Sequence, residues 1–238
     1  MNIQVYIPTR GRIGLNNQVT LREFLNYSSH IPVLVCPPDE ASQHLKYAPR
    51  VRKCKAKGIG PTRQFILETS CADVVIMADD DMRFSYRPDP SNIKLERCTN
   101  LEVMLELIRT TVEDCGYIHG GVGARQGNNR KDLSGPRQGV LEDGHVFVDC
   151  ERVNNMHFMD RLAVLDAGGR LDALPVMEDF YFTLTMLLKG FPNRVIHDYV
   201  WNQEGSGSIG GCSLYRTPQV QEKGANGLQE SFPELAVF

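Results

Sequence analysis

The segment VVIMADDDM, residues 74–82, constrains the fold of this 238-residue chain most strongly. Four apolar residues and an alanine in succession are typical of a strand buried on both faces, and such strands belong to sheets that are covered by helices. Asp79, Asp80 and Asp81 then lie at the carboxyl end of this strand, where open α/β sheets bind their ligands. Because strand side chains alternate, we expect Asp79 and Asp81 on one side, about 7 Å apart, and Asp80 on the other.

Two explanations fit these aspartates. At an effective dielectric of about 20, two such charges repel by roughly 2 to 3 kcal/mol, so something must offset the repulsion. A solvated turn after the strand is one explanation, because aspartate is common in turns. A divalent cation held by hard carboxylate oxygens is the other, and the position at the carboxyl end of a strand favours the metal.

The other apolar runs alternate between strand and helix patterns. Strands are predicted at 3–7, 31–36, 117–122, 145–153 and 194–201, and helices at 17–25, 58–70, 100–115 and 178–190. This alternation is typical of βαβ units, so the predicted fold class is α/β, with a mixed, mainly parallel central sheet flanked by helices. The segment 120–144 is rich in glycine and arginine and predicts a long functional or mobile loop. We expect one domain, 1–238, made of the halves 1–100 and 101–200 and a tail, 201–238.

Composition narrows the range of partners. Lysine and arginine number 26 against 29 acidic residues, so the net charge of -3 gives no global signature of nucleic-acid binding, and such a partner requires a local basic patch. No apolar run approaches the roughly 18 residues of a membrane span, and the N-terminus lacks the apolar region of a secretory signal, so we expect a cytoplasmic protein with no membrane partner. The seven cysteines are scattered singly, which suggests neither a disulfide framework nor a structural zinc site.

Two loops carry arginines beside a strand end or a helix start. There, unpaired backbone amides and a guanidinium can receive a nucleotide and its phosphates, although each arginine alone could be a surface charge. The residues expected to contact the nucleotide are Pro8, Thr9, Arg10 and Arg12 in IPTRGR, Gly60 and Arg63 in GIGPTRQ, and Asp79 and Asp80 in the acidic segment. Later in the chain, Glu178 and Asp179 begin a helix, where they either complement the helix dipole or supply a general base.

The order of these parts resembles that of glycosyltransferases of the GT-A fold over most of residues 3–200. The matching features are the IPTRGR loop, the GPTRQ helix start, the strand that ends in ADDD, the ED pair before a helix closed by glycine, and the histidine of RVIHD. In such enzymes a D-x-D motif holds the ribose and a manganese ion that bridges the two phosphates of a nucleotide sugar. The resemblance places Asp81 closest to the metal and Asp79 nearer the ribose, and it leaves Asp80 most tolerant of exchange for asparagine.

The same resemblance implies the cofactors and the chemistry. The donor is a UDP-sugar bound by the 1–100 half, with Mn²⁺ or Mg²⁺ as the metal, and the other half binds the acceptor. His197 completes the metal site unless it is structural, as lone histidines at strand ends often are. Asp179 first and Glu178 second act as the base of an inverting reaction. If neither points at the site, a retaining route remains open.

A narrower resemblance concerns the segments GVGARQGNN and NQEGSGSIGGCSLYRT. They look like glycosyltransferases of tailed bacteriophages, including those associated with TET-like dioxygenases, which glycosylate hydroxymethylated pyrimidines in DNA. This resemblance implies 5-hydroxymethylcytosine in phage DNA as the acceptor and the cytoplasm of an infected bacterium as the location. Trp201 is expected either to stack on a sugar or base or to pack in the core. The basic groove that the acidic chain would need is expected from Arg125, Arg130, Lys131, Arg137 and Arg216.

Other functions remain open from the sequence. A glycosyltransferase could act on a carbohydrate or protein acceptor, and a non-catalytic module that binds a nucleotide sugar would need no base. Sugar nucleotidyltransferases open with a GxGxR loop, which IPTRGRIG copies poorly. Enzymes of the haloacid-dehalogenase type carry D-x-D on the first strand, whereas here the acidic strand is about the third.

Overall fold

A computed structural model describes residues 1–89, 94–125, 138–140, 145–203 and 216–235. The strands are β1 (Ile3–Pro8), β2 (Val33–Cys36), β3 (Val51–Lys53), β4 (Val74–Ala78), β5 (Met82–Tyr86), β6 (Glu96–Arg97), β7 (His119–Ala124), β8 (Gln138–Val140), β9 (Val146–Asp149), β10 (Met156–Asp160) and β11 (Arg194–Gln203). The helices are η1 (Leu15–Asn17), α1 (Val19–Tyr27), α2 (Ala41–His44), α3 (Ile59–Thr69), α4 (Glu102–Glu113), α6 (Arg161–Asp166), α7 (Glu178–Leu188) and α8 (Pro218–Ser231). None of the helices described is long and apolar enough to cross a membrane.

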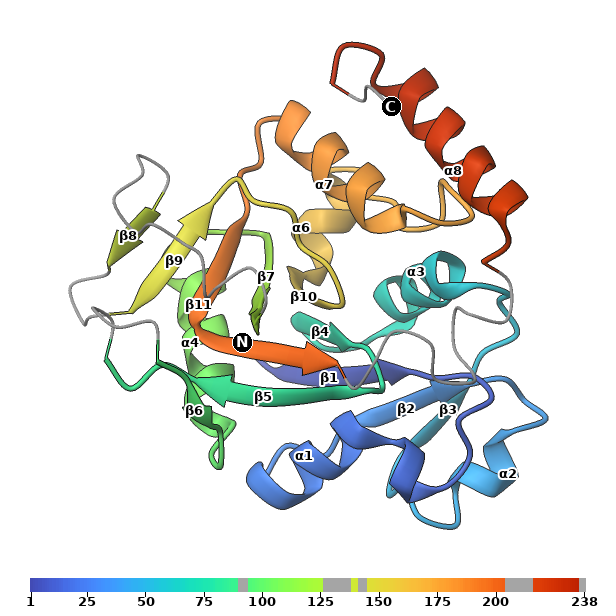
Figure 1. The fold of residues 1–238 in the computed structure, drawn as a ribbon, viewed down its shortest axis with the longest axis vertical. Helices are drawn as coiled ribbons and strands as arrows, with labels where there is room; N and C mark the ends of the chain where they lie inside the picture. Colours follow the sequence, from blue (N-terminus) through green and yellow to red (C-terminus); the bar gives the residue numbers. More distant parts are fainter. Residues whose placement is uncertain (90–93, 126–137, 141–144, 204–215, 236–238) are drawn as a thin grey trace.

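One mixed sheet forms the centre of the molecule (Figure 1). Its main path runs β3-β2-β1-β4-β10-β7-β11-β5-β6, and β9 pairs with both β11 and β8. Strands β5, β9 and β10 run against the others. The carboxyl ends of β1, β4, β7 and β11 therefore lie at the same edge of the sheet. This arrangement confirms the predicted α/β class with a mixed, mostly parallel sheet.

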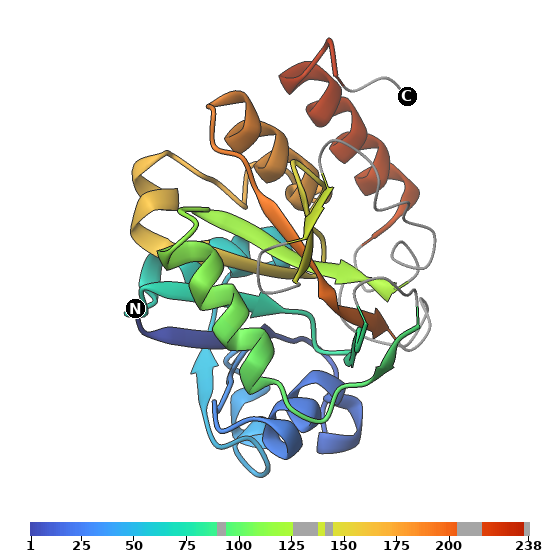
Figure 2. The ribbon, with the colours of Figure 1, turned by 90° about the vertical axis from the view of Figure 1, so that its left-hand side faces the viewer.

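Helices cover both faces of this sheet. Apolar side chains of α1 and α4 pack on one face, and Figure 2 shows α4 lying across it. The helices α3, α6 and α7 pack on the opposite face. Strand β4 contributes to both layers, since Ile76 belongs to the first cluster and Met77 to the second. The expectation that this strand is buried on both faces is confirmed, and burial of each such side chain stabilises the fold by about 1.5 to 3 kcal/mol.

The largest departures from the predicted elements lie beside the acidic segment and near the C-terminus. Strand β5 begins at Met82, directly after the aspartates, and pairs with β11. The stretch 158–169, predicted as one short helical or extended piece, contains both the end of β10 and helix α6, because Asp160 caps the helix by accepting from the Ala163 amide at 3.0 Å. The loosely helical tail is the helix α8, which begins after the capping residue Thr217.

Candidate active site

The three aspartates form the turn between β4 and β5, at the edge where β1 also ends. Thr20, at the start of α1, fixes the backbone of this turn. Its amide donates to the Asp80 carbonyl at 3.1 Å, and its hydroxyl donates to the Asp79 carbonyl. The same hydroxyl accepts from the Met82 amide at 2.8 Å. The aspartates therefore leave the extended conformation, and strict strand alternation does not apply to them.

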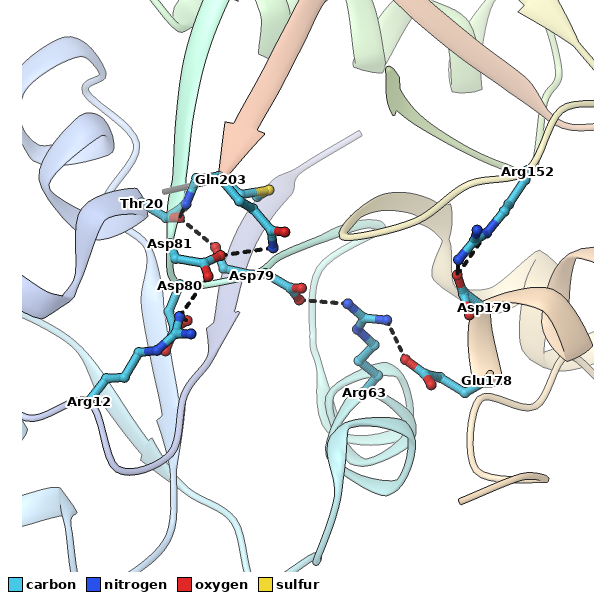
Figure 3. A network of polar contacts seen from close by, with 11 residues as sticks. Arg12, Thr20, Arg63, Asp79, Asp80, Asp81, Arg152, Glu178, Asp179 and Gln203 are labelled. Carbon is cyan, nitrogen blue, oxygen red and sulfur yellow. Dashed lines mark hydrogen bonds and ion pairs between the residues drawn. The ribbon is translucent and has the colours of Figure 1, made fainter. Parts of the chain in front are cut away.

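The side chains of the turn divide between two arginines, as Figure 3 shows. Arg12 pairs with Asp80 and also with Asp81, where the N–O distance is 3.0 Å. Gln203, at the end of β11, donates to Asp81 at 3.0 Å. Asp79 instead faces Arg63. We predicted that Asp79 and Asp81 lie on one side and Asp80 on the other. The polar contacts group them differently, because Asp80 and Asp81 share the guanidinium of Arg12 and Asp79 pairs with Arg63.

Arg63 joins the acidic turn to α7. It is only 3% exposed, and it donates to Asp79 at 2.7 Å and to Glu178 at 2.8 Å. Gly60, one turn earlier in α3, lets this helix lie against the backbone of Leu171, because a Cβ built there would lie 2.3 Å from the Leu171 oxygen. Two distant parts of the sequence, the acidic turn and the ED pair, therefore form one connected network through a buried guanidinium.

Asp179 belongs to a separate pair on the outer side of Glu178 (Figure 3). Arg152, in the loop between β9 and β10, donates to Asp179 through Nη2 at 2.7 Å and Nε at 3.1 Å. Its guanidinium lies 3.7 Å from the centre of the Phe180 ring. Sequence reasoning missed Arg152 because it lay inside the predicted strand 145–153, whereas β9 ends at Asp149 and Arg152 follows in the loop.

Desolvation sets the protonation of these carboxylates. Burial raises the pKa of Asp80 to about 7, although Arg12 opposes the rise. Burial also raises the pKa of Asp79 and of Glu178, against the attraction of Arg63 in both cases. In the network of Figure 3, five carboxylates face three guanidiniums. A cation that binds among these carboxylates favours their deprotonated forms and so opposes the effect of burial.

The sequence matches the family described as TET-Associated Glycosyltransferase over residues 3–211. The chain belongs to the TET-associated glycosyltransferase family. It is therefore a glycosyltransferase, and the enzyme class predicted from the ADDD and ED motifs is confirmed. A comparison with curated protein sequences finds no match.

Solved structures of similar shape come from TarS of S. aureus. TarS 1-349 in complex with UDP shares 12% identity, with a TM-score of 0.58 over 100% of this chain and 67% of that chain. The complex of TarS 1-349 with UDP-GlcNAc shares 16% identity, with a TM-score of 0.56 over 96% of this chain and 67% of that chain. A longer TarS chain shares 14% identity, with a TM-score of 0.53 over 84% of this chain and 36% of that one. These likenesses confirm the GT-A fold of the glycosyltransferase.

A metal ion fits the acidic turn only as part of a larger complex. The described residues contain no group of three or more His, Cys, Asp or Glu side chains that could hold a metal ion. Asp79 and Asp81 still supply the carboxylate oxygens that Mg²⁺ and Mn²⁺ prefer. Mg²⁺ commonly binds one or two carboxylates and completes its shell with water and substrate phosphates. These two aspartates therefore fit a divalent ion that a phosphate-bearing ligand would complete.

His197 does not form a metal site with the acidic turn, which corrects its predicted role as a metal ligand. It pairs with Glu151 at 2.9 Å and packs against Gly123. Among the described residues it joins no group of three or more His, Cys, Asp or Glu side chains that could hold a metal ion.

Trp201 is structural, so the alternative of an acceptor contact is wrong. It is 7% exposed within the core cluster beneath α4, and its indole donates to the Val122 carbonyl at 2.8 Å. The side chain faces α4, on the opposite side of the sheet from α7.

The predicted basic residues are scattered. Arg10 is exposed and lines a cavity of about 1090 Å³ with Lys57 and residues of α8. Arg125 is exposed at the end of β7. Arg216 is exposed too, and it is among the positive charges that oppose the burial-driven rise in the pKa of Asp79. Arg130, Lys131 and Arg137 lie outside the described residues. Of the nucleotide contacts, Pro8 ends β1, and the hydroxyl of Thr9 donates to Asp80 at 2.5 Å.

Proposed function

We propose that this glycosyltransferase moves a sugar from a UDP-sugar to the hydroxymethyl oxygen of 5-hydroxymethylcytosine in DNA, with inversion at the anomeric carbon. One observation carries the proposal: buried Arg63 connects the carboxylates of the acidic turn to the ED pair, so a donor site and a candidate base belong to one network. The TarS structures with UDP and UDP-GlcNAc support a UDP-sugar as donor. The association of the family with TET supports a hydroxymethylpyrimidine as acceptor.

The donor would bind at the acidic turn, within the half formed by residues 1–100. Asp79 and Asp81 would hold Mn²⁺ or Mg²⁺ together with the diphosphate, and the bound ion would neutralise the leaving group. Arg12 keeps Asp81 in place, and Arg63 does the same for Asp79. The remaining proposed nucleotide contacts are Pro8, Thr9, Arg10, Gly60 and Asp80. These residues lower the barrier by fixing the donor and by countering the charge that develops on its phosphates.

Asp179 is the proposed base. Glu178 is 4% exposed and shares the buried Arg63 with Asp79, whereas Asp179 pairs with the half-exposed Arg152 and is 11% exposed. Asp179 takes the proton of the acceptor hydroxyl as the hydroxyl oxygen bonds to the anomeric carbon. The bond from that carbon to the diphosphate oxygen breaks, and UDP leaves with the electron pair. Attack from the face opposite the leaving group gives inversion.

A carbohydrate or protein acceptor is the second candidate. The net charge of -3 favours it, because binding to the DNA backbone depends mainly on clustered positive charge. Of the predicted basic groove, Arg125 and Arg216 lie within the described residues, and both are exposed. They remain proposed DNA contacts.

The test is a transfer assay read by mass. The protein is incubated with Mn²⁺, a panel of UDP-sugars, and DNA with or without 5-hydroxymethylcytosine, and the digested nucleosides are then weighed. We expect one nucleoside to gain the mass of one sugar, only in the modified DNA. UDP release that no DNA alters would contradict the DNA acceptor and leave a carbohydrate or a protein. A parallel assay with EDTA tests the metal, and we expect it to abolish transfer.

A further inference from the structure

We propose that Arg152 is a specificity residue on the acceptor side: it binds a backbone phosphate of the DNA while it holds Asp179 in position to take the proton. This inference rests on the proposed function, in which Asp179 is the base and DNA the acceptor. It adds a residue that no sequence motif marks and a part of the acceptor, the phosphodiester, that the residue would recognise.

The guanidinium of Arg152 meets only one oxygen of the Asp179 carboxylate. Nε and Nη2 of Arg152 both donate to the same oxygen of Asp179, Oδ2, at 3.1 and 2.7 Å. Within the part of the chain that the structure describes, no hydrogen bond reaches the other oxygen, Oδ1. The pair therefore fixes the orientation of the carboxylate and leaves one oxygen for the proton of an acceptor hydroxyl.

The guanidinium of Arg152 also has donors that Asp179 does not engage. Arginine has five N–H donors in one rigid plane, and Asp179 engages only Nε and Nη2. No hydrogen bond from Nη1 occurs among the described residues. The side chain is 48% exposed, so a ligand that arrives from solvent can reach it. A guanidinium already held on one edge is a strong donor to a phosphate oxygen on another, because its charge assists both hydrogen bonds.

The side chain of Arg152 is restrained by its surroundings. Its guanidinium lies 3.7 Å from the centre of the Phe180 ring, an arrangement that restrains the plane. Cys150 and Asn155 on either side of Arg152, and Met177 before the ED pair, adopt positive φ values of 57°, 59° and 63°. They are the non-glycine residues with positive φ in the described chain. Such backbone persists only where its surroundings enforce it, and it concentrates at functional sites.

The loop that carries Arg152 is also anchored to the donor side. The carbonyl of Asn155 accepts from the Asp79 amide at 3.0 Å, so the end of this loop lies against the acidic turn. At its start, the Glu151 amide donates to the side chain of Asn193 at 3.0 Å. A phosphate bound by Arg152 would therefore be placed relative to both the donor and the base, and a DNA strand held in this way would present its hydroxymethyl group to Asp179.

The test is a double-mutant cycle between Arg152 and the phosphates of a DNA oligonucleotide that contains one 5-hydroxymethylcytosine. Phosphates near this base are replaced one at a time by neutral methylphosphonates, and kcat/KM for sugar transfer is measured with wild type and Arg152→Gln. At one position we expect the methylphosphonate to lower the kcat/KM of the wild type at least tenfold. The same methylphosphonate should lower the kcat/KM of Arg152→Gln less than twofold, because this variant lacks the phosphate contact already.

Controls separate folding from function. Arg170→Gln removes a 55% exposed arginine that pairs with Asp172 and Glu68 and, among the described residues, with neither acid of the ED pair, and it should show the wild-type response to every methylphosphonate. UDP affinity and melting temperature check that Arg152→Gln is folded, and Arg152→Lys, which keeps the charge, should retain part of the phosphate effect. Losses that simply multiply at every position would overturn the inference. A wild type that glycosylates no DNA but modifies another acceptor would instead refute the proposed function on which the inference rests.

Discussion

Arg63 and Arg152 hold neighbouring acids of α7, but in opposite surroundings. Arg63 is 3% exposed and is shared by two carboxylates, Asp79 and Glu178. Arg152 is 48% exposed, and in the described part of the chain Asp179 is its one carboxylate partner. Breaking a buried ion pair leaves an uncompensated charge in the interior, whereas an exposed pair contributes little to stability. The inner pair therefore maintains the geometry of the site, and the outer pair is free to meet a substrate.

The largest effect should come from the inner pair. Arg63→Gln leaves Glu178 buried and Asp79 partly buried without their counter-charge, so we expect the free energy of unfolding to fall by about 3 to 5 kcal/mol. Urea denaturation at neutral pH measures this change. A fall below about 1 kcal/mol would show that water reaches Arg63 and would remove the contrast with Arg152.

The pH dependence of stability should report on His119, a buried histidine beneath α7. Burial lowers the pKa of His119 to about 4, and its Nε2 lies 3.0 Å from the Phe191 carbonyl. The unfolded chain therefore binds the extra proton between about pH 6.5 and 4, so stability is lost as the pH falls through this range, by roughly 3 kcal/mol. His119→Gln should flatten this part of the stability profile. An unchanged slope would show that His119 does not titrate in this way.

The spacing between α3 and α7 gives the next effect. Gly60→Ala places a methyl group 2.3 Å from the Leu171 carbonyl oxygen and 3.3 Å from Cβ of Glu178. The backbone must shift, and we expect a loss of about 1 to 3 kcal/mol together with a higher KM for the donor, because Arg63 moves with α3. Thermal unfolding and donor titration measure the two changes. A variant with wild-type stability would contradict the close packing described here.

The smallest effect on stability should come from the outer pair. Arg152→Gln removes a half-exposed guanidinium from Asp179, whose side chain is 11% exposed, so we expect the free energy of unfolding to fall by about 1 kcal/mol, less than for Arg63→Gln. Urea denaturation beside Arg63→Gln gives the comparison directly. A loss as large as that of Arg63→Gln would show that both arginines serve the fold equally.

Much of the fold could be predicted from sequence periodicity. The apolar run before Asp79 was enough to predict a strand buried on both faces, and strand and helix patterns alternated as in a parallel sheet. A turn at the aspartates was one of the two explanations that the sequence allowed, but β5 was not predicted, because it follows with no glycine or proline to mark it. A five-residue apolar run does not reveal where the chain reverses.

The site could be predicted only where a side chain suited to binding or catalysis stood at a predicted strand end or helix start. The carboxylates and Arg63 stood at strand ends and helix starts, and the structure joins them. His197 looked equivalent in sequence, but the structure pairs it with Glu151 and packs it against Gly123, since a position near a strand end does not say which side chains a histidine will meet. Arg152 was invisible because its partner, Asp179, is 27 residues away and comes from a different element.

The central claim is that Asp179 takes the proton while Glu178 only positions Arg63. The most direct test is the single-turnover rate of sugar transfer to 5-hydroxymethylcytosine DNA by Asp179→Asn, measured beside its affinity for UDP. We expect the rate to fall by about 10³-fold, within the range for loss of a general base, while the affinity for UDP stays within about twofold of wild type. A variant that keeps more than a tenth of the wild-type rate, or that loses UDP affinity in parallel, would contradict the claim.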